Sequence, residues 1–256
     1  MALFQSGNPT LSQKIFDRTV DASSSETMTV RGTINKFGFL LIMLLVGAAY
    51  TWYLYQDFNK QGTMMTLMWV GLIGGLILSL VISFKPNLSP YLAPAYGILE
   101  GFAIGAISAV INDQFSRKYP GIVMQAVGIT FGVAITVFAL YNFRIIKATE
   151  KFKSIMMTAI IGIFVFYMIW MVLGFFGVQL SFMNWNDTSA LGIGINLFVA
   201  VIAALSLILD FDRIEKGAEA GAPKYMEWYG GFGLLVTIVW LYIEILKLLS
   251  RFASRK

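Results

Sequence analysis

Three acidic residues lie inside long apolar stretches of this sequence. Glu100 is found within YGILEGFAIGAIS, Asp210 ends the stretch VAVIAALSLILD, and Glu244 lies in the last apolar stretch of the chain. An ionised side chain at the centre of a membrane costs at least ~2.5–3.5 kcal/mol, so such residues face a protein interior or a wet cavity. Acids retained at this depth typically mark an ion or proton path. These three residues are therefore the candidates for chemistry.

The stretch that contains Asp210 carries further polar residues on the same helix face. Asn196, Ser206 and Asp210 are separated by nearly whole helical turns, so a helix would place them in one stripe. Such a stripe is expected to face a bundle interior or a water path. Asp212 points elsewhere, and we expect it to form an ordinary i,i+4 pair with Lys216 at the cytoplasmic surface.

The last apolar stretch also presents one polar face. Gly230, Thr237, Glu244 and Arg251 follow one another at heptad spacing. Lys247 lies one turn after Glu244 and could neutralise it locally. The sequence therefore leaves two readings open for Glu244, a gating acid or the acid of a local ion pair.

Glu100 lies on a stretch with glycines at every fourth position, Gly97, Gly101 and Gly105. Small residues at this spacing give a smooth strip for close helix packing. Glu100 would lie roughly 15 Å into such a helix. We expect it to come within hydrogen-bonding or one-water reach of the Asp210 face, although a buried, protonated acid without function is the alternative.

The composition places all of these residues in a membrane. Of 256 residues, 57% are hydrophobic and only 13% are charged, whereas a soluble domain carries about 25% charged residues. We predict an all-α protein with an N-terminal cytoplasmic tail, 1–36, and one domain of seven transmembrane helices, 37–256. Each span needs about 20 apolar residues, and the predicted spans are 37–55, 64–84, 91–112, 122–143, 155–177, 190–211 and 230–249.

The residue types that are missing exclude several functions. The chain contains no cysteine and no histidine, which removes thiolate chemistry, axial haem histidine and intramembrane serine catalysis. We therefore expect neither an enzyme nor a cofactor. Without a long basic arm, nucleic acid is not an expected partner. With seven spans, most of the 19 Lys and Arg residues fall in segments on the same side of the membrane as the N-terminus. Positively charged segments stay in the cytoplasm, so the sequence predicts a cytoplasmic N-terminus and an external C-terminus.

Two other classes of membrane protein share some of these features but fit the sequence poorly. One has seven spans, and the other needs two aspartates in the membrane. A retinal protein needs a lysine in the last helix, but Lys247 lies within a turn of Arg251 near the helix end. An intramembrane aspartyl protease needs a GxGD motif, and LGIGIN (191–196) lacks its acid. An integral membrane protein with a structural or regulatory role and no transport of its own remains the alternative to an ion path.

Short motifs add a family resemblance. LDFDRIEKG (209–217) and WLYIEILKLL (240–249) resemble the transmembrane Bax inhibitor motif family, and SGNPTL (6–11) and YGILEG (96–101) resemble one bacterial branch of it. The resemblance implies a seven-helix bundle in the bacterial inner membrane, with the last helix surrounded by the others. It also implies a pH-sensitive calcium leak controlled by one acid in each of the last two helices. Asp210 and Glu244 take these places. Asp212 stands where many relatives have glutamine, and it is a further candidate for gating or ion binding.

The implied mechanism follows from electrostatics. Two carboxylates that lie close together in a medium of low dielectric share a proton, because the first charge and desolvation oppose the second ionisation. Deprotonation would leave two like charges that repel each other and offer oxygen ligands to Ca²⁺. We therefore expect Asp210 and Glu244 to bind the ion transiently, with flux rising as pH rises. Membrane lipid and Ca²⁺ are the expected partners, and no protein partner is identified.

The position of the turn before the last helix decides which acid meets Asp210. A plain antiparallel hairpin turning near Ala222 would leave Glu244 roughly 15 Å from Asp210 along the axis. The two meet if the turn is displaced and residues 221–229 form an extended loop. We favour this displaced turn, and Glu100 is the other candidate partner of Asp210.

Overall fold

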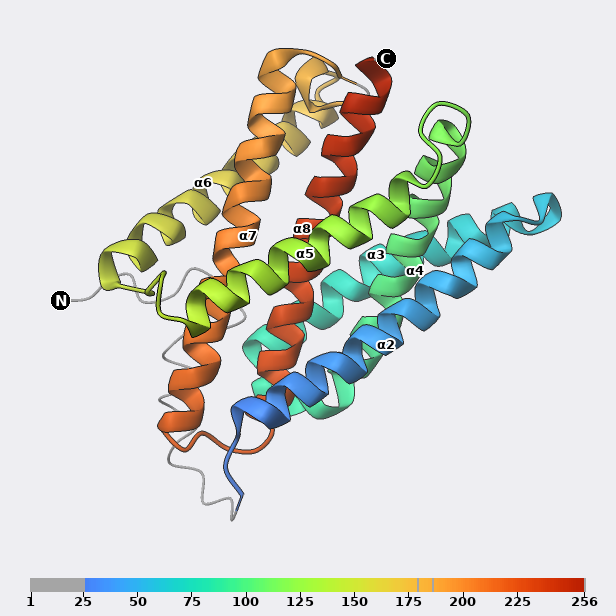
Figure 1. Ribbon diagram of the computed structural model, residues 1–256. Coiled ribbons are helices and arrows are strands. Elements are labelled where there is room, and N and C mark those ends of the chain that lie inside the picture. Colours follow the sequence, from blue (N-terminus) through green and yellow to red (C-terminus); the bar gives the residue numbers. More distant parts are fainter. Residues whose placement is uncertain (1–25, 179, 186, 256) are drawn as a thin grey trace. The chain divides into compact units, whose positions relative to one another are not determined.

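The computed structural model describes residues 26–178, 180–185 and 187–255. Within these residues the chain forms seven long α-helices joined by turns and loops (Figure 1). Each is long and apolar enough to cross a membrane, which confirms the all-α, seven-span prediction. The helices are α2 (Val30–Tyr55), α3 (Gln61–Phe84), α4 (Ser89–Phe115), α5 (Ile122–Asn142), α6 (Glu150–Phe175), α7 (Ala190–Glu219) and α8 (Met226–Arg255), with the 3-10 turns η1 (Phe58–Lys60), η2 (Pro86–Leu88) and η3 (Ser181–Met183).

Several helices extend beyond the predicted apolar spans because polar residues cap their ends. Thr29 accepts a hydrogen bond from the Gly32 N–H at 2.9 Å, so α2 begins at Val30, earlier than predicted. Thr149 caps α6 in the same way through the Phe152 N–H. A side-chain oxygen at this position satisfies an N–H that the helix itself leaves unpaired. Hydropathy alone does not register this extension.

The turn between α7 and α8 is short, and the displaced turn predicted from the sequence is wrong. α8 begins at Met226, so residues 221–229 do not form an extended loop. Gly221 adopts a φ of +69°, a left-handed conformation that costs glycine little. The Pro223 carbonyl then accepts a hydrogen bond from the Met226 N–H at 2.9 Å. The chain therefore turns as a plain hairpin.

The chain divides into two compact units, and α7 and α8 contribute to both. Of the described residues, unit 1 comprises 115–211 and 237–255, which include α5, α6, most of α7 and the second part of α8. Unit 2 comprises 26–114 and 212–236, which include α2, α3, nearly all of α4, the end of α7 and the start of α8.

The predicted N-terminal tail is only partly described. Residues 1–25, with the SGNPTL motif, lie outside the described residues. Residues 30–36, which were predicted to belong to the tail, are the first part of α2. The first long helix therefore begins before residue 37.

In unit 2, the predicted glycine strip on α4 is a helix-packing surface. A Cβ at Gly97 would lie 3.0 Å from the Leu40 carbonyl oxygen of α2. At Gly101 and Gly105 a Cβ would overlap the carbonyl oxygens of Leu44 and Ala48. Backbones approach this closely only where side chains are absent, so the strip fixes α4 against α2.

In unit 1, apolar side chains of α6 and α7 form a core cluster. Met156 and Ile163 of α6 pack with Val199, Ile202 and Leu209 of α7, and Trp240 of α8 lies against this cluster. Because the apolar residues of α7 face α6, its polar stripe is available for α8.

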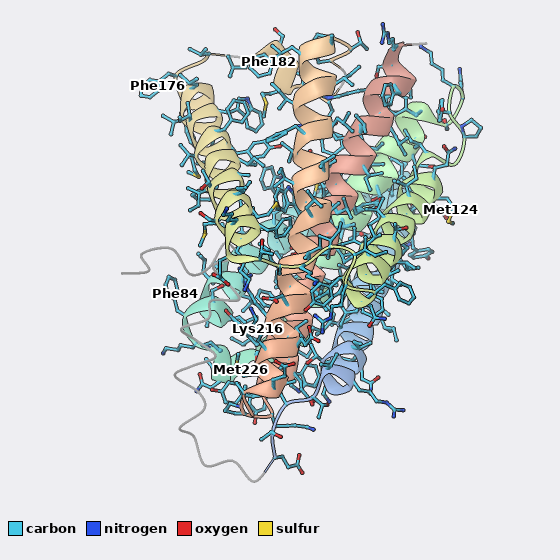
Figure 2. The ribbon with its side chains drawn as sticks, turned by 60° about the vertical axis from the view of Figure 1, so that its left-hand side comes forward. Phe84, Met124, Phe176, Phe182, Lys216 and Met226 are labelled. Carbon is cyan, nitrogen blue, oxygen red and sulfur yellow. The ribbon has the colours of Figure 1, made fainter. Side chains whose placement is uncertain are left out.

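Large apolar side chains are exposed on the helices of both units. Phe84 of α3 and Met124 of α5 are examples, and Phe176, directly after α6, is exposed as well; all three are labelled in Figure 2. α8 is less exposed than the other helices. Of its most apolar 18-residue stretch 67% is buried, the largest share among the seven spans. An apolar exposed surface combined with polar buried residues is the reverse of a soluble protein and suits a lipid environment.

Candidate functional site

Asp210 is fully buried on α7 and hydrogen-bonded to α8. Its side chain is 1% exposed, and its Oδ2 accepts a hydrogen bond from the Thr237 hydroxyl at 2.6 Å. Asn196 and Ser206, which share its predicted face, are buried as well. The predicted polar stripe of α7 is therefore an internal surface, and within unit 1 its partner is α8.

Glu244 is buried further along α8, where neutral polar groups hydrogen-bond its carboxyl. It is 4% exposed. The Asn196 amide donates to Glu244 Oε2 at 2.7 Å and to the Glu244 carbonyl oxygen at 3.1 Å, and the Tyr167 hydroxyl of α6 donates to Oε1 at 3.1 Å. Glu244 thus joins α6, α7 and α8 within unit 1.

The expected direct pair of Asp210 and Glu244 is not formed in this structure. Among the described residues, the Glu244 carboxyl is hydrogen-bonded by Asn196 and Tyr167, while Thr237 faces Asp210. Thr237 and Glu244 are seven residues apart on α8, or about 10 Å along the helix. The cause is the plain hairpin, which leaves the two acids at different levels.

These groups define what we call the polar track of unit 1. It consists of Asn196, Ser206 and Asp210 on α7 with Thr237 and Glu244 on α8. The residues of both helices that were predicted to share a polar face are therefore brought together. The track supplies carboxyl, hydroxyl and amide oxygens. Oxygens of these types coordinate Ca²⁺ and form hydrogen bonds with water.

Lys247 interacts electrostatically with Glu244, as the local-pair reading of the sequence expected, and it also contacts Tyr167. Its ammonium lies 5.9 Å from the centre of the Tyr167 ring, within the range of a cation–π interaction. Tyr167 therefore contacts both charges, since its ring faces Lys247 and its hydroxyl donates to Glu244. Tyr167 was not among the predicted site residues, and its hydroxyl within a mostly apolar span was the available signal.

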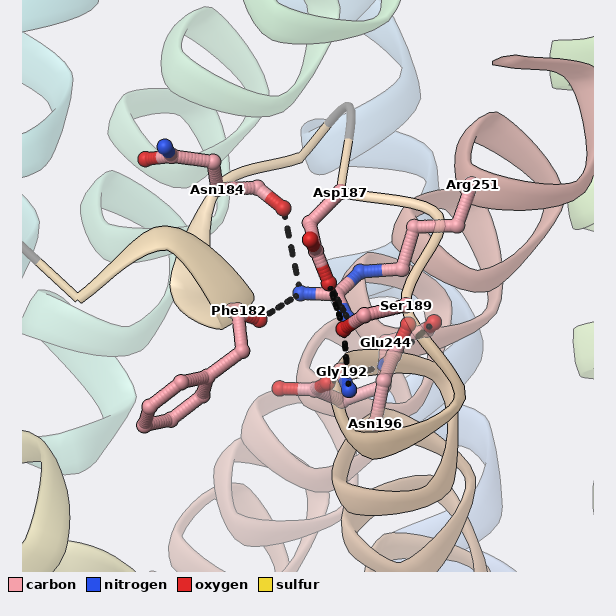
Figure 3. A network of polar contacts seen from close by, with 8 residues as sticks. All are labelled: Phe182, Asn184, Asp187, Ser189, Gly192, Asn196, Glu244 and Arg251. Atoms are coloured by element: carbon pink, nitrogen blue, oxygen red, sulfur yellow. Dashed lines mark hydrogen bonds and ion pairs between the residues drawn. The ribbon is translucent and has the colours of Figure 1, made fainter. Parts of the chain in front are cut away.

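Beyond Glu244, Arg251 lies on the same predicted face and reaches the loop between α6 and α7 (Figure 3). Its Nη2 donates to the carbonyl oxygens of Phe182 at 2.7 Å and Asn184 at 3.1 Å. Its Nη1 lies 3.9 Å from Asp187 Oδ2. The sequence predicted the face of Arg251 but not these partners, because the loop has no pattern that identifies them.

Glu100 belongs to unit 2 and has a local partner there. Tyr96, one turn earlier on α4, hydrogen-bonds the Glu100 carboxyl. Glu100 Oε2 also lies 3.1 Å from the position that a Cβ at Gly75 of α3 would occupy, so a small residue on α3 leaves room for it. The predicted approach of Glu100 to Asp210 stays a prediction.

Two further acids lie near the α7–α8 turn of unit 2. Asp212 pairs with Lys216 at 2.9 Å, which confirms the predicted i,i+4 pair. Glu227, which the sequence analysis did not single out, accepts hydrogen bonds from the Thr29 N–H and hydroxyl, each at 3.0 Å, and pairs with Lys224 at 3.2 Å. A negative charge at the start of a helix is favourable, so Glu227 anchors α2 to α8.

The described residues contain no group of three or more Asp, Glu, His or Cys side chains that could hold a metal ion. The predicted transient binding of Ca²⁺ by Asp210 and Glu244 stays a prediction. Any such ion would complete its coordination with the hydroxyl and amide oxygens of the polar track and with water.

Seven apolar helices and buried acids define a polytopic membrane protein with a polar interior. Residues 8–254 match the family described as Bax inhibitor 1 like. The match covers nearly the whole chain, so the protein belongs to this family, as its short motifs suggested. None of the curated proteins compared with the chain matches it.

Proposed function

We propose that the protein is a pH-sensitive cation leak whose permeant ion is Ca²⁺ and whose gating acids are Asp210 and Glu244. The observation that carries the proposal is the burial of both acids, 1% and 4% exposed, within helices apolar enough to cross a membrane. Acids are retained at such positions where an ion or proton path needs them. The resemblance of the short motifs to the transmembrane Bax inhibitor motif family implies the same activity.

The mechanism follows from the partners of the two acids. The Thr237 hydroxyl donates to the Asp210 carboxyl, and the Asn196 amide and the Tyr167 hydroxyl donate to the Glu244 carboxyl. An ionised carboxylate buried in an apolar interior is costly unless it is paired and hydrogen-bonded, and water or a cation can supply this compensation. Ionisation therefore draws water or a cation into the polar track, and flux rises with pH. Each acid acts at its own level of the track, with no shared proton required.

We also propose the orientation and location that the charge distribution indicates. The N-terminus faces the cytoplasm and the C-terminus the outside of a bacterial inner membrane. The protein needs no cofactor and catalyses no reaction, and lipid and Ca²⁺ are its partners. Protease protection of a tag at either end in oriented vesicles tests the orientation.

The activity is tested with purified protein in liposomes that contain a Ca²⁺-sensitive dye. Ca²⁺ entry is measured over a pH series in wild type, Asp210→Asn and Glu244→Gln. We expect wild-type flux to rise with pH and both variants to flatten that dependence, because neither amide can be ionised. Glu150→Gln removes an exposed acid at the start of α6 and is the matched control.

Two results would contradict the proposal. If wild-type protein of verified fold gives no protein-dependent Ca²⁺ flux at any pH, the leak is wrong. If Asp210→Asn keeps the wild-type pH profile, Asp210 has no part in gating.

A structural or regulatory membrane protein is the second candidate, and one observation favours it. The hydrogen bonds from Asn196 and Tyr167 to Glu244 join α7 and α6 to α8. In a structural protein this joining of helices would be their whole role. In that case Glu244→Gln lowers stability and no variant changes ion flux. Unfolding measurements on the same variants separate the two candidates.

A further inference from the structure

We propose that Arg251 is a gate residue that closes the loop end of the polar track by holding the loop between α6 and α7. This inference rests on the proposed cation path, because it assigns the control of that path. Arg251 is 1% exposed and lies two turns beyond Glu244 on α8. Figure 3 shows its guanidinium among the loop residues, with Asn196 and Glu244 close by.

A single guanidinium fastens the loop at three points. Nη2 binds the carbonyl oxygens of Phe182 and Asn184, and Nη1 faces the Asp187 carboxylate. Asp187 in turn accepts a hydrogen bond from the Ser189 hydroxyl. Ser189 also accepts from the Gly192 N–H at 3.0 Å, in the first turn of α7. The loop, the start of α7 and the end of α8 are therefore joined through Arg251.

The hydrogen-bonding capacity of the buried guanidinium is only partly used. Among the described residues, Arg251 Nε and Nη1 have no hydrogen-bond partner, although a guanidinium carries five N–H donors. The Oδ1 atom of Asn196, which is 2% exposed, also has no partner. Buried donors without acceptors make an arrangement costly to keep. The contact of Arg251 with the loop therefore leaves two buried donors unsatisfied, and this cost favours release of the loop.

The charge of Arg251 is suited to blocking cations. Lys247 and Arg251 place two positive charges on the last turns of α8, and Glu244 and Asp187 lie beside them. A cation that moves along the polar track beyond Glu244 meets the guanidinium before it reaches the loop. Removing the guanidinium would both free the loop and lower this electrostatic barrier.

The loop contact can be measured without reference to ion flux. The chain has no cysteine, so the full-length variant T188C/R255C carries spin labels only at these two exposed positions, on the loop and at the end of α8. Pulsed electron paramagnetic resonance in liposomes gives the distance distribution. We expect R251Q and D187N each to broaden it towards longer distances. R117Q removes an exposed arginine of unit 1 and should leave it unchanged.

Unchanged distances in both R251Q and D187N would overturn the gate. D187N acts from the loop side, so it keeps the test available if R251Q does not fold. On liposomes with the Ca²⁺ dye, we expect R251Q to raise Ca²⁺ entry several-fold over wild type and R117Q to have no effect. A released loop with wild-type flux would overturn the gating role. Absence of flux in wild type and all variants would refute the proposed leak, whatever the distances show.

Discussion

Gly192 lies beside the contacts that Arg251 makes with Phe182, Asn184 and Asp187. Adding one methyl group at Gly192 therefore tests whether these contacts are present. A Cβ built there would overlap Asp187 Oδ2 and Arg251 Nη1 and would lie 2.9 Å from the Phe182 carbonyl oxygen. Gly194, two residues further on α7, has nothing within 4 Å of its Cβ position. Gly192→Ala and Gly194→Ala therefore add the same methyl group to the same helix, and only the first meets the network.

The structure sets the expected magnitude. Replacing glycine by alanine within a helix stabilises it by about 0.5–1 kcal/mol, because glycine loses more backbone freedom on folding. This gain is common to both variants and cancels in their difference. Gly192→Ala also displaces the guanidinium, and a buried polar group left without its partner costs about 1–3 kcal/mol. We expect Gly192→Ala to be less stable than Gly194→Ala by about this amount.

The assay is reversible unfolding of the purified protein in mixed micelles, with increasing sodium dodecyl sulfate and tryptophan fluorescence as the signal. Both variants are also made in an Arg251→Gln background. If the methyl group acts through the guanidinium, the difference between the two alanines shrinks to within about 0.5 kcal/mol there, as a double-mutant cycle requires for coupled sites.

Two results would refute this reasoning. Equal free energies of unfolding for Gly192→Ala and Gly194→Ala would mean that the close approach at Gly192 is not present in the folded protein. A full difference that persists in the Arg251→Gln background would mean that the methyl group acts on the loop backbone and not on the guanidinium.

Three other substitutions test separate contacts. Thr237→Val removes the hydroxyl that donates to Asp210 at 2.6 Å, and we expect the free energy of unfolding to fall by about 1–3 kcal/mol in the same micelle assay. Gly101→Leu places a side chain against the backbone of α2, so folded yield should drop sharply, whereas Gly38→Leu, which meets nothing within 4 Å of its Cβ, should be tolerated. Glu227→Ala removes the acceptor at the start of α2, and amide hydrogen exchange should become faster in the first turn of α2 and unchanged in α5.

The sequence determined the features that depend on local composition and periodicity. Seven apolar stretches predicted seven helices, because a membrane span needs about 20 apolar residues, and all seven are present. Helical periodicity predicted the polar faces of α7 and α8 and the Asp212–Lys216 pair, which one helix forms by itself. The glycine strip of α4 predicted close packing, and the structure has it.

Only the tertiary structure decided which residues meet across helices. The offset that separates Glu244 from Asp210 depends on the length of the α7–α8 turn, where a glycine at φ +69° and the early start of α8 leave no room for displacement. Hydrophobic periodicity does not encode the register between two helices. The loop partners of Arg251 are mostly backbone carbonyl oxygens, which every residue carries, so no sequence pattern could have identified them.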